Sequence, residues 1–196
     1  MPTIFTHGAI GFTAMRPVFG AAYDRRLLYA SILLPMLPDA DALFMRWIPY
    51  SHPFGHRGFT HSLLFAALVG MGTAALAVRG NWAHSYIKLA VFFAAITASH
   101  GLFDAMTSGG LGVAFFAPFD NTRYFLPWRP IPVSPMSAAG LMTARGLRVI
   151  LWEFALFWFF AMSAALWDRR GAARVIIALL FLIAGAAVWF QALFPY

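Results

Sequence analysis

Long apolar runs separated by short polar links dominate the chain after its first 61 residues. Four of these runs approach or reach the roughly 20 residues that a helix needs to cross a bilayer core. They cover residues 62–78, 86–106, 147–167 and 175–194. The pattern therefore predicts an all-α, polytopic membrane helical bundle with about four transmembrane spans.

The first 61 residues show a different pattern. Their apolar runs, 4–15 and 27–38, contain about 12 residues each, which is too short to cross a bilayer alone. They predict short interfacial or re-entrant helices. Pro35 and Pro38 are expected to end the second helix, because proline removes a helical donor and clashes with the preceding turn. The carboxylates of Asp39 and Asp41 would then lie at a helix end.

The whole chain, residues 1–196, is expected to form a single membrane-embedded domain. Residues 107–146 are rich in glycine and proline, including Pro-Trp-Arg-Pro-Ile-Pro at 127–132, and predict an ordered loop. The short links at 79–85 and 168–174 should lie on one side of the membrane. The first 61 residues and the ends of the spans that adjoin the ordered loop would then gather on the other side.

Composition supports an integral membrane protein, since 61% of residues are hydrophobic, 11% are charged and the mean hydropathy is +0.72. The absence of cysteine excludes thiolate ligands, so any metal must take histidine and carboxylate ligands. The net charge of +7 could suit nucleic acid or anionic lipid. No nucleic-acid recognition motif is visible, so membrane lipid is the expected partner and nucleic acid is not.

The most informative polar residues are His100 and Asp104, which lie four positions apart inside a predicted span. This spacing places them on one helix face, and a carboxylate at membrane depth costs about 2.5–3.5 kcal/mol on insertion scales. A bound cation would offset that cost. An arginine partner, Arg57 or Arg148, would do so as well.

Other histidines and aspartates lie on the same predicted side. Zinc takes about four nitrogen or oxygen ligands, and Asp39 or Asp41 together with His61, His100 and Asp104 would supply them. His56 could be a ligand or could cap the turn before the first span. The remaining polar candidates are expected to be interfacial (His52, His84), solvated (Asp120, Asp168), or, for Glu153, either functional or paired with Arg145 or Arg148.

Five sequence strings carry a family resemblance. They are Met1-Pro-Thr-Ile-Phe-Thr-His7, Leu37-Pro-Asp-Ala-Asp41, Gly55-His-Arg-Gly-Phe-Thr-His-Ser62, Ser99-His-Gly-Leu-Phe-Asp104, and 124–135 in the ordered loop. With these strings the chain resembles the YdjM-type family of bacterial inner-membrane metal-dependent hydrolases. The resemblance covers roughly the first 135 residues, and it implies a multi-pass protein of the bacterial inner membrane.

A more remote similarity is to zinc-dependent phospholipases C and the related single-strand nucleases, which are all-helical enzymes with several zinc ions. It implies a main site of Asp39 or Asp41, His61, His100 and Asp104, with His7 beside it. Those enzymes have further histidine and glutamate ligands after the His-xxx-Asp motif, whereas no histidine follows His100 here. One or two ions, most simply Zn²⁺, are therefore expected.

These residues predict a membrane-bound metal-dependent hydrolase that acts on a lipid or lipid-linked phosphoester through a metal-activated water. Asp39 would accept the proton, and Arg57 or Arg129 would neutralise phosphate charge. One alternative is a haem protein for electron transfer, with His61 and His100 as axial ligands. Another is a small cation or proton transporter.

Arginines flank both predicted faces, so the positive-inside rule gives little guidance. It favours cytoplasmic short links, which would leave the reactive face periplasmic. The sequence leaves the oligomeric state open.

Overall fold

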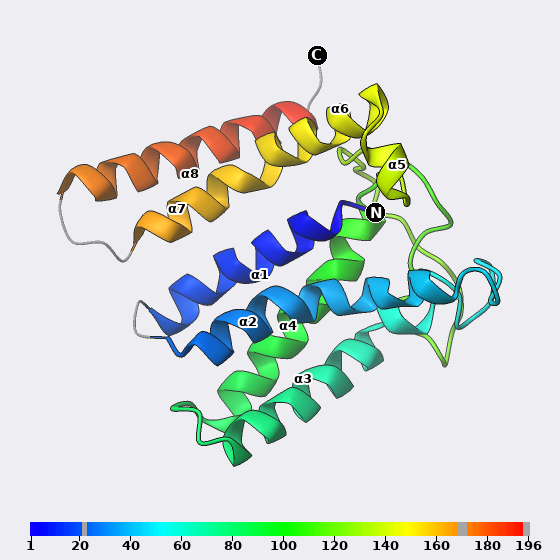
Figure 1. Ribbon diagram of the computed structural model, residues 1–196, viewed down its shortest axis with the longest axis horizontal. Helices are drawn as coiled ribbons and strands as arrows, with labels where there is room; N and C mark the ends of the chain where they lie inside the picture. Colours follow the sequence, from blue (N-terminus) through cyan, green and yellow to red (C-terminus); the bar gives the residue numbers. More distant parts are fainter. Residues whose placement is uncertain (21–22, 168–171, 194–196) are drawn as a thin grey trace.

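The computed structural model describes residues 1–20, 23–167 and 172–193. Within these ranges the regular elements are all helical, apart from two isolated β-bridges, which confirms the predicted fold class (Figure 1). The helices in chain order are α1 (Ile4–Phe19), α2 (Arg25–Leu33), η1 (Leu34–Phe44), η2 (Phe59–His61), α3 (Leu63–Arg79), α4 (Tyr86–Ala105), α5 (Ala138–Leu141), α6 (Ala144–Glu153), η3 (Phe154–Trp158), α7 (Phe159–Trp167) and α8 (Ala172–Leu193).

Three helical segments in the described residues are long and apolar enough to cross a membrane. They are Arg25–Phe44, Tyr86–Ala105 and Ala144–Leu166. The last two correspond to the second and third predicted spans. The first and fourth predicted spans appear as shorter apolar helices, Leu63–Arg79 and Val175–Phe190.

The second α-helix ends just before Pro35, as the prolines predicted, but the helical segment does not end there. At Leu34 the chain changes from α-helix to the 3₁₀-helix η1, which contains both prolines and continues to Phe44. Pro35 lies in the first turn of η1, where a missing N–H is tolerated. With rises of 1.5 and 2.0 Å per residue, α2 and η1 together reach roughly 35 Å, which is enough to span. Asp39 and Asp41 are therefore buried in the middle of a helical segment rather than at its end.

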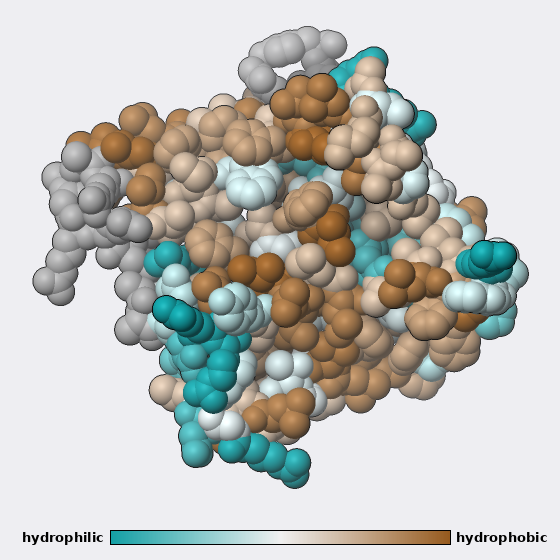
Figure 2. Space-filling model, viewed as in Figure 1, coloured by the Kyte–Doolittle hydropathy of each residue, from teal (hydrophilic) through white to brown (hydrophobic). Residues whose placement is uncertain are grey.

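Helices α3 and α4 form a closely packed hairpin, and α7 and α8 form a second one (Figure 1). Gly70 allows the first contact, since a Cβ there would lie 2.5 Å from the backbone nitrogen of Ala94, whereas Gly72 meets nothing within 4 Å. Helix α1 packs against α2, η1 and α7, and so joins the two halves of the bundle. Figure 2 shows apolar side chains over the middle of one face, with hydrophilic residues toward its edges.

The predicted ordered loop lies over the end of α4 that carries His100 and Asp104. Isolated bridges pair Thr107 with Ile131 and Val113 with Tyr124, and α5 is its one short helix among the described residues. The side chain of Ile131 is fully buried. These contacts fix the loop against the helix ends where the candidate site lies.

Candidate metal centre

Four buried side chains from three helices converge at one end of the bundle. Asp39 comes from η1, His61 from η2, and His100 and Asp104 from successive turns of α4. Each offers one ligand atom, and the four atoms lie within 4.8 Å of one another. The group could hold a metal ion, as the spacing of His100 and Asp104 and the nearby Asp and His motifs predicted.

The distances between these atoms fit a small coordination sphere. Nε2 of His100 lies 3.0 Å from Nε2 of His61 and 3.3 Å from Oδ1 of Asp39. Oδ2 of Asp104 lies 3.6 Å from Nε2 of His61 and 3.9 Å from Nε2 of His100. A tetrahedral zinc site with bonds near 2.0–2.1 Å has ligand atoms roughly 3.3 Å apart. The set therefore has the dimensions of a site for one small divalent cation.

Hydrogen bonds on the far side of each ring direct the two histidines toward the centre. Nδ1 of His100 lies 2.7 Å from the carbonyl oxygen of Pro35, which can only accept, so Nδ1 carries the hydrogen. Nδ1 of His61 faces Oγ1 of Thr60 at 3.0 Å and Oδ2 of Asp41 at 3.3 Å. The Thr60 hydroxyl donates to Asp41, so its oxygen is left to accept from His61. In the neutral form of both rings, two bare Nε2 atoms face each other, and a cation between them removes the conflict.

The charged groups around His61 also favour a positive charge at the centre. Burial alone would lower the pKa of His61, but the carboxylates of Asp39 and Asp41 outweigh burial and raise the pKa to about 9. Among the described residues, neither oxygen of Asp39 or Asp104 forms a hydrogen bond. Buried carboxylates without such partners are costly. The centre therefore favours positive charge, which either a proton or a metal ion can supply.

Asp41 lies behind His61 rather than with the four converging atoms. Its Oδ1 faces Nδ1 of His56 at 2.6 Å, and its Oδ2 accepts from Thr60. Asp41, His56 and His61 form a second group whose ligand atoms also lie within 4.8 Å of one another. The structure thus separates the two aspartates, with Asp39 in the four-residue group and Asp41 in contact with His56 and His61.

Arg57 is the arginine partner of Asp104, one of the two that the sequence allowed. Its Nε lies 3.0 Å from Oδ2 of Asp104, and the side chain is 1% exposed. Nη1 and Nη2 donate to the carbonyl of Gly109 and the hydroxyl of Thr107, both at 2.9 Å. Arg57 adopts a φ of 61°, a region that non-glycine residues rarely occupy. All three guanidinium nitrogens are engaged, so Arg57 holds Asp104 and the loop in place.

His7 lies beside the group, as the remote resemblance implies. Its ring stacks on that of His100 with centroids 3.8 Å apart, and its Nε2 is 3.7 Å from Oδ1 of Asp104. Neither ring nitrogen forms a hydrogen bond with a described residue. Burial lowers the pKa of His7 to about 4, which keeps the ring neutral and able to bind a cation.

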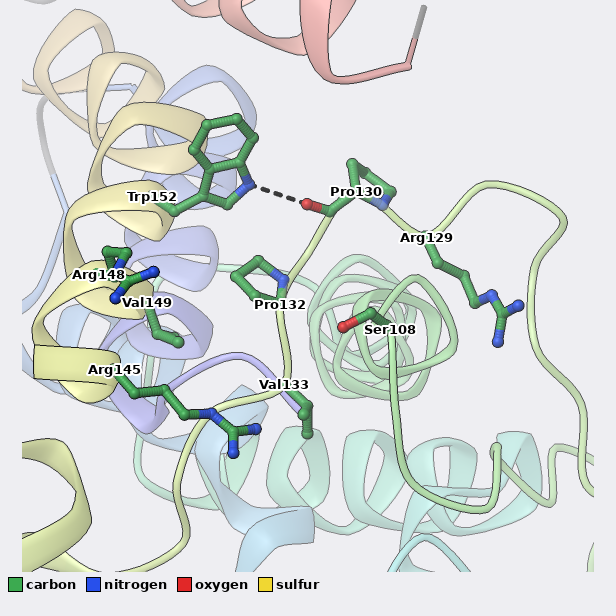
Figure 3. A pocket seen from close by; sticks show the side chains of 9 residues that line it. All are labelled: Ser108, Arg129, Pro130, Pro132, Val133, Arg145, Arg148, Val149 and Trp152. Carbon is green, nitrogen blue, oxygen red and sulfur yellow. Dashed lines mark hydrogen bonds between the residues drawn. The ribbon is translucent and has the colours of Figure 1, made fainter. Parts of the chain in front are cut away.

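The structure differs from the sequence predictions for Glu153 and Arg129. Glu153 does not pair with an arginine in the described part of the chain, but accepts hydrogen bonds from Thr3 and Thr6 at 2.6–2.9 Å. Among the described residues, Arg129 has no contact with the four-residue group of Asp39, His61, His100 and Asp104. It lines a separate pocket with Arg145 and Arg148 (Figure 3). Nothing in the sequence pattern pointed to Thr3 or Thr6, because hydroxyl residues are common at helix starts.

Comparison with known protein families gives the same family that the sequence strings resemble. The model of the YdjM inner membrane protein family matches residues 1–193. The chain belongs to the YdjM inner membrane protein family. Inner membrane protein YbcI of Escherichia coli (strain K12) is 37% identical over 174 residues, which cover 87% of this chain and 99% of that relative. No solved structure matches. The YdjM family and this relative are both inner membrane proteins by name, which confirms the predicted family and the predicted inner membrane.

Proposed function

We propose that this protein is a membrane-embedded metal-dependent hydrolase that acts on a lipid or lipid-linked phosphoester. The observation that carries the proposal is the pair of histidine Nε2 atoms 3.0 Å apart, with each ring's Nδ1 already engaged and two carboxylates beside them. A set of nitrogen and oxygen ligands without cysteine suits Zn²⁺. A second ion would occupy the Asp41, His56 and His61 group only by replacing the hydrogen on Nδ1 of His61.

His61, His100 and Asp104 would hold a Zn²⁺ in this site, and the ion would lower the pKa of a bound water to about 7 and polarise the bond to be cleaved. Asp39 would take the proton from that water, because its Oδ1 faces the two histidines and its Oδ2 forms no hydrogen bond with described residues. Arg57 positions Asp104 through its ion pair. His7 packs against His100 and limits the movement of that ring.

The phosphoester is supported by the membrane setting and by the order of motifs. Three helical segments can cross a membrane, so a substrate within reach of the site is most simply a lipid. The order His7, Asp39, His61, His100 and Asp104 is similar to that of the phospholipase C type of zinc enzyme. The site lies at the end of the bundle where the ordered loop meets α4, on the face proposed to be periplasmic.

The geometry does not favour the haem alternative. Two axial ligands must stand on opposite sides of a flat macrocycle, but Nε2 of His61 and Nε2 of His100 lie only 3.0 Å apart. The carboxylates of Asp39 and Asp104 also occupy the surroundings of these atoms. A compact cation site accounts for all four side chains.

Metal analysis tests the proposal first. The wild-type protein, purified in detergent without chelator, is expected to retain zinc, and a His100→Ala/Asp104→Ala variant is expected to lose it. A His52→Ala/Asp120→Ala variant is the matched control, because it removes the same residue types outside the cluster. Equal metal content in all three proteins would contradict the metal site.

Hydrolysis is tested separately. Phospholipids and polyprenyl phosphoesters in mixed micelles are incubated with the zinc-loaded wild-type protein and with the two variants, and released products are measured by mass spectrometry. We expect product with the wild type and the His52/Asp120 control only. Metal retention without turnover of any phosphoester in the panel would refute the phosphoester assignment and leave the metal site intact.

A further inference from the structure

A second site opens beside α6, apart from the metal group. It is a pocket of about 610 Å³ between the start of α6 and the ordered loop. Figure 3 shows Arg145 and Arg148 on the helix side and Arg129 on the loop side, with Trp152 and Pro130 joined by a hydrogen bond. The pocket therefore combines three cationic side chains with apolar walls.

The three arginines have no carboxylate partner among the described residues. No ion pair joins Arg129, Arg145 or Arg148 to a carboxylate there, and all three side chains are exposed. The recorded contact of Arg129 is with the ring of Phe125, whose centroid is 5.0 Å away. Three uncompensated positive charges around one pocket create a potential that favours an anion.

The position of the helix arginines strengthens that potential. Arg145 and Arg148 occupy the second and fifth positions of α6, close to its N-terminus. The N-terminal end of a helix dipole is positive, so cations there are unfavourable, and like charges three residues apart repel. A bound anion would reverse both effects, because it interacts favourably with the helix end and with both side chains.

Contacts between the loop and the helices hold the two sides of the pocket in place. Trp152 Nε1 donates to the carbonyl of Pro130 at 2.9 Å, and this ties the loop to α6. The next loop residue, Ile131, is fully buried and accepts a hydrogen bond from the backbone of Ser108 at 2.9 Å. Arg129 is thus attached to an anchored segment, which reduces the entropic cost of binding a ligand between loop and helix.

The pocket also lies at one end of a candidate membrane span, where lipid headgroups are expected. The candidate span Ala144–Leu166 begins at the first residue of α6, so Arg145 and Arg148 stand at the end of a membrane-crossing helix. Arginine binds phosphate oxygens through paired N–H groups, while the proline and tryptophan walls suit the glycerol and upper acyl region. We propose that this pocket binds the phosphate of an anionic membrane phospholipid. This binding does not depend on the proposed hydrolysis.

Native mass spectrometry of the full chain in neutral detergent tests the proposal. The probes are phosphatidylglycerol, phosphatidylcholine with the same acyl chains, and inorganic phosphate. We expect the wild type to bind phosphatidylglycerol preferentially, and Arg129→Gln/Arg145→Gln/Arg148→Gln to lose about tenfold or more in affinity. The control, Arg25→Gln/Arg46→Gln/Arg79→Gln, removes the same charge elsewhere and should bind as the wild type does.

Several outcomes would overturn the proposal. Equal losses in both triple variants would assign the effect to net charge, and equal binding of the two lipids would remove the need for an anionic headgroup. Inorganic phosphate bound as tightly as phosphatidylglycerol would make the ligand a free ion. The His100→Ala/Asp104→Ala variant separates the two sites, because it should lose metal and still bind phosphatidylglycerol.

Discussion

Replacing Asp41 with asparagine tests how the metal centre is built. The change keeps the size of the side chain and removes its negative charge. In the native protein the two carboxylate oxygens face Nδ1 of His56 at 2.6 Å and Nδ1 of His61 at 3.3 Å, and one accepts from Thr60. An amide has only one acceptor atom, so its nitrogen would face either His56 or His61 and would keep that contact only if the ring nitrogen gives up its hydrogen.

The structure sets the expected size of the effect. If Asp41 orients His61 and raises its basicity from behind the ring, its loss weakens metal binding without removing a ligand. Such partners of metal-ligating histidines are worth about 10–100-fold in affinity, or roughly 1.4–2.7 kcal/mol. We therefore expect the zinc Kd of Asp41→Asn to rise within this range, with the number of bound ions unchanged.

Chelator competition in detergent measures the Kd, and elemental analysis measures the number of ions. Asp120→Asn is the control, since Asp120 accepts from Thr122 and Tyr124 in the loop, outside the metal group. An unchanged Kd would refute the orienting role. A fall from two bound ions to one would show instead that Asp41 is itself a ligand, of a second ion in the Asp41, His56 and His61 group.

Four further substitutions address packing, charge and hydrogen bonding. Gly70→Ala should lower the free energy of unfolding by about 1–3 kcal/mol, because the new Cβ would be overpacked against α4. Gly72→Ala adds a Cβ in open space and should raise the free energy of unfolding by less than about 1 kcal/mol. Equal melting temperatures of the two variants in detergent would contradict the close approach of α3 and α4. Arg57→Met should lower the free energy of unfolding by about 3–5 kcal/mol, because it leaves the carboxylate of Asp104 buried without the guanidinium that pairs with it. A denaturation midpoint equal to that of the wild type would disprove this. Glu153→Gln should lower the free energy of unfolding by about 1–3 kcal/mol through lost hydrogen bonds to Thr3 and Thr6. Its zinc content should equal that of the wild type, and loss of zinc would show that Glu153 is a ligand.

The features that the sequence predicted best depend on local spacing. The i, i+4 relation of His100 and Asp104 is a property of any α-helix, so α4 places both on one face whatever packs against it. The cost of a buried carboxylate then required a cation or an arginine nearby. The structure supplies the arginine, with Nε of Arg57 3.0 Å from Oδ2 of Asp104, and it brings histidine nitrogens that could hold a cation close to the same carboxylate.

The features that the sequence missed depend on distant contacts. Glu153 receives its hydrogen bonds from Thr3 and Thr6, which lie about 150 positions earlier in the chain. The continuation of the helical segment past Pro35 was missed for a related reason, because the prediction considered only an α-helix. A 3₁₀-helix has a different hydrogen-bond pattern, and packing of η1 against α1 and α4 stabilises that alternative.

The 3₁₀ form of η1 also sets the angle between its two aspartates. A 3₁₀-helix turns about 120° per residue, so Asp39 and Asp41 project about 120° apart, whereas an α-helix would separate them by about 160°. The smaller angle lets one short segment place one carboxylate in the ligand group and the other against His56 and His61. Rewinding this segment into an α-helix would turn Asp41 by about 40° relative to Asp39, so the packing against α1 and α4 that stabilises the 3₁₀ form also helps to keep both carboxylates on the same centre.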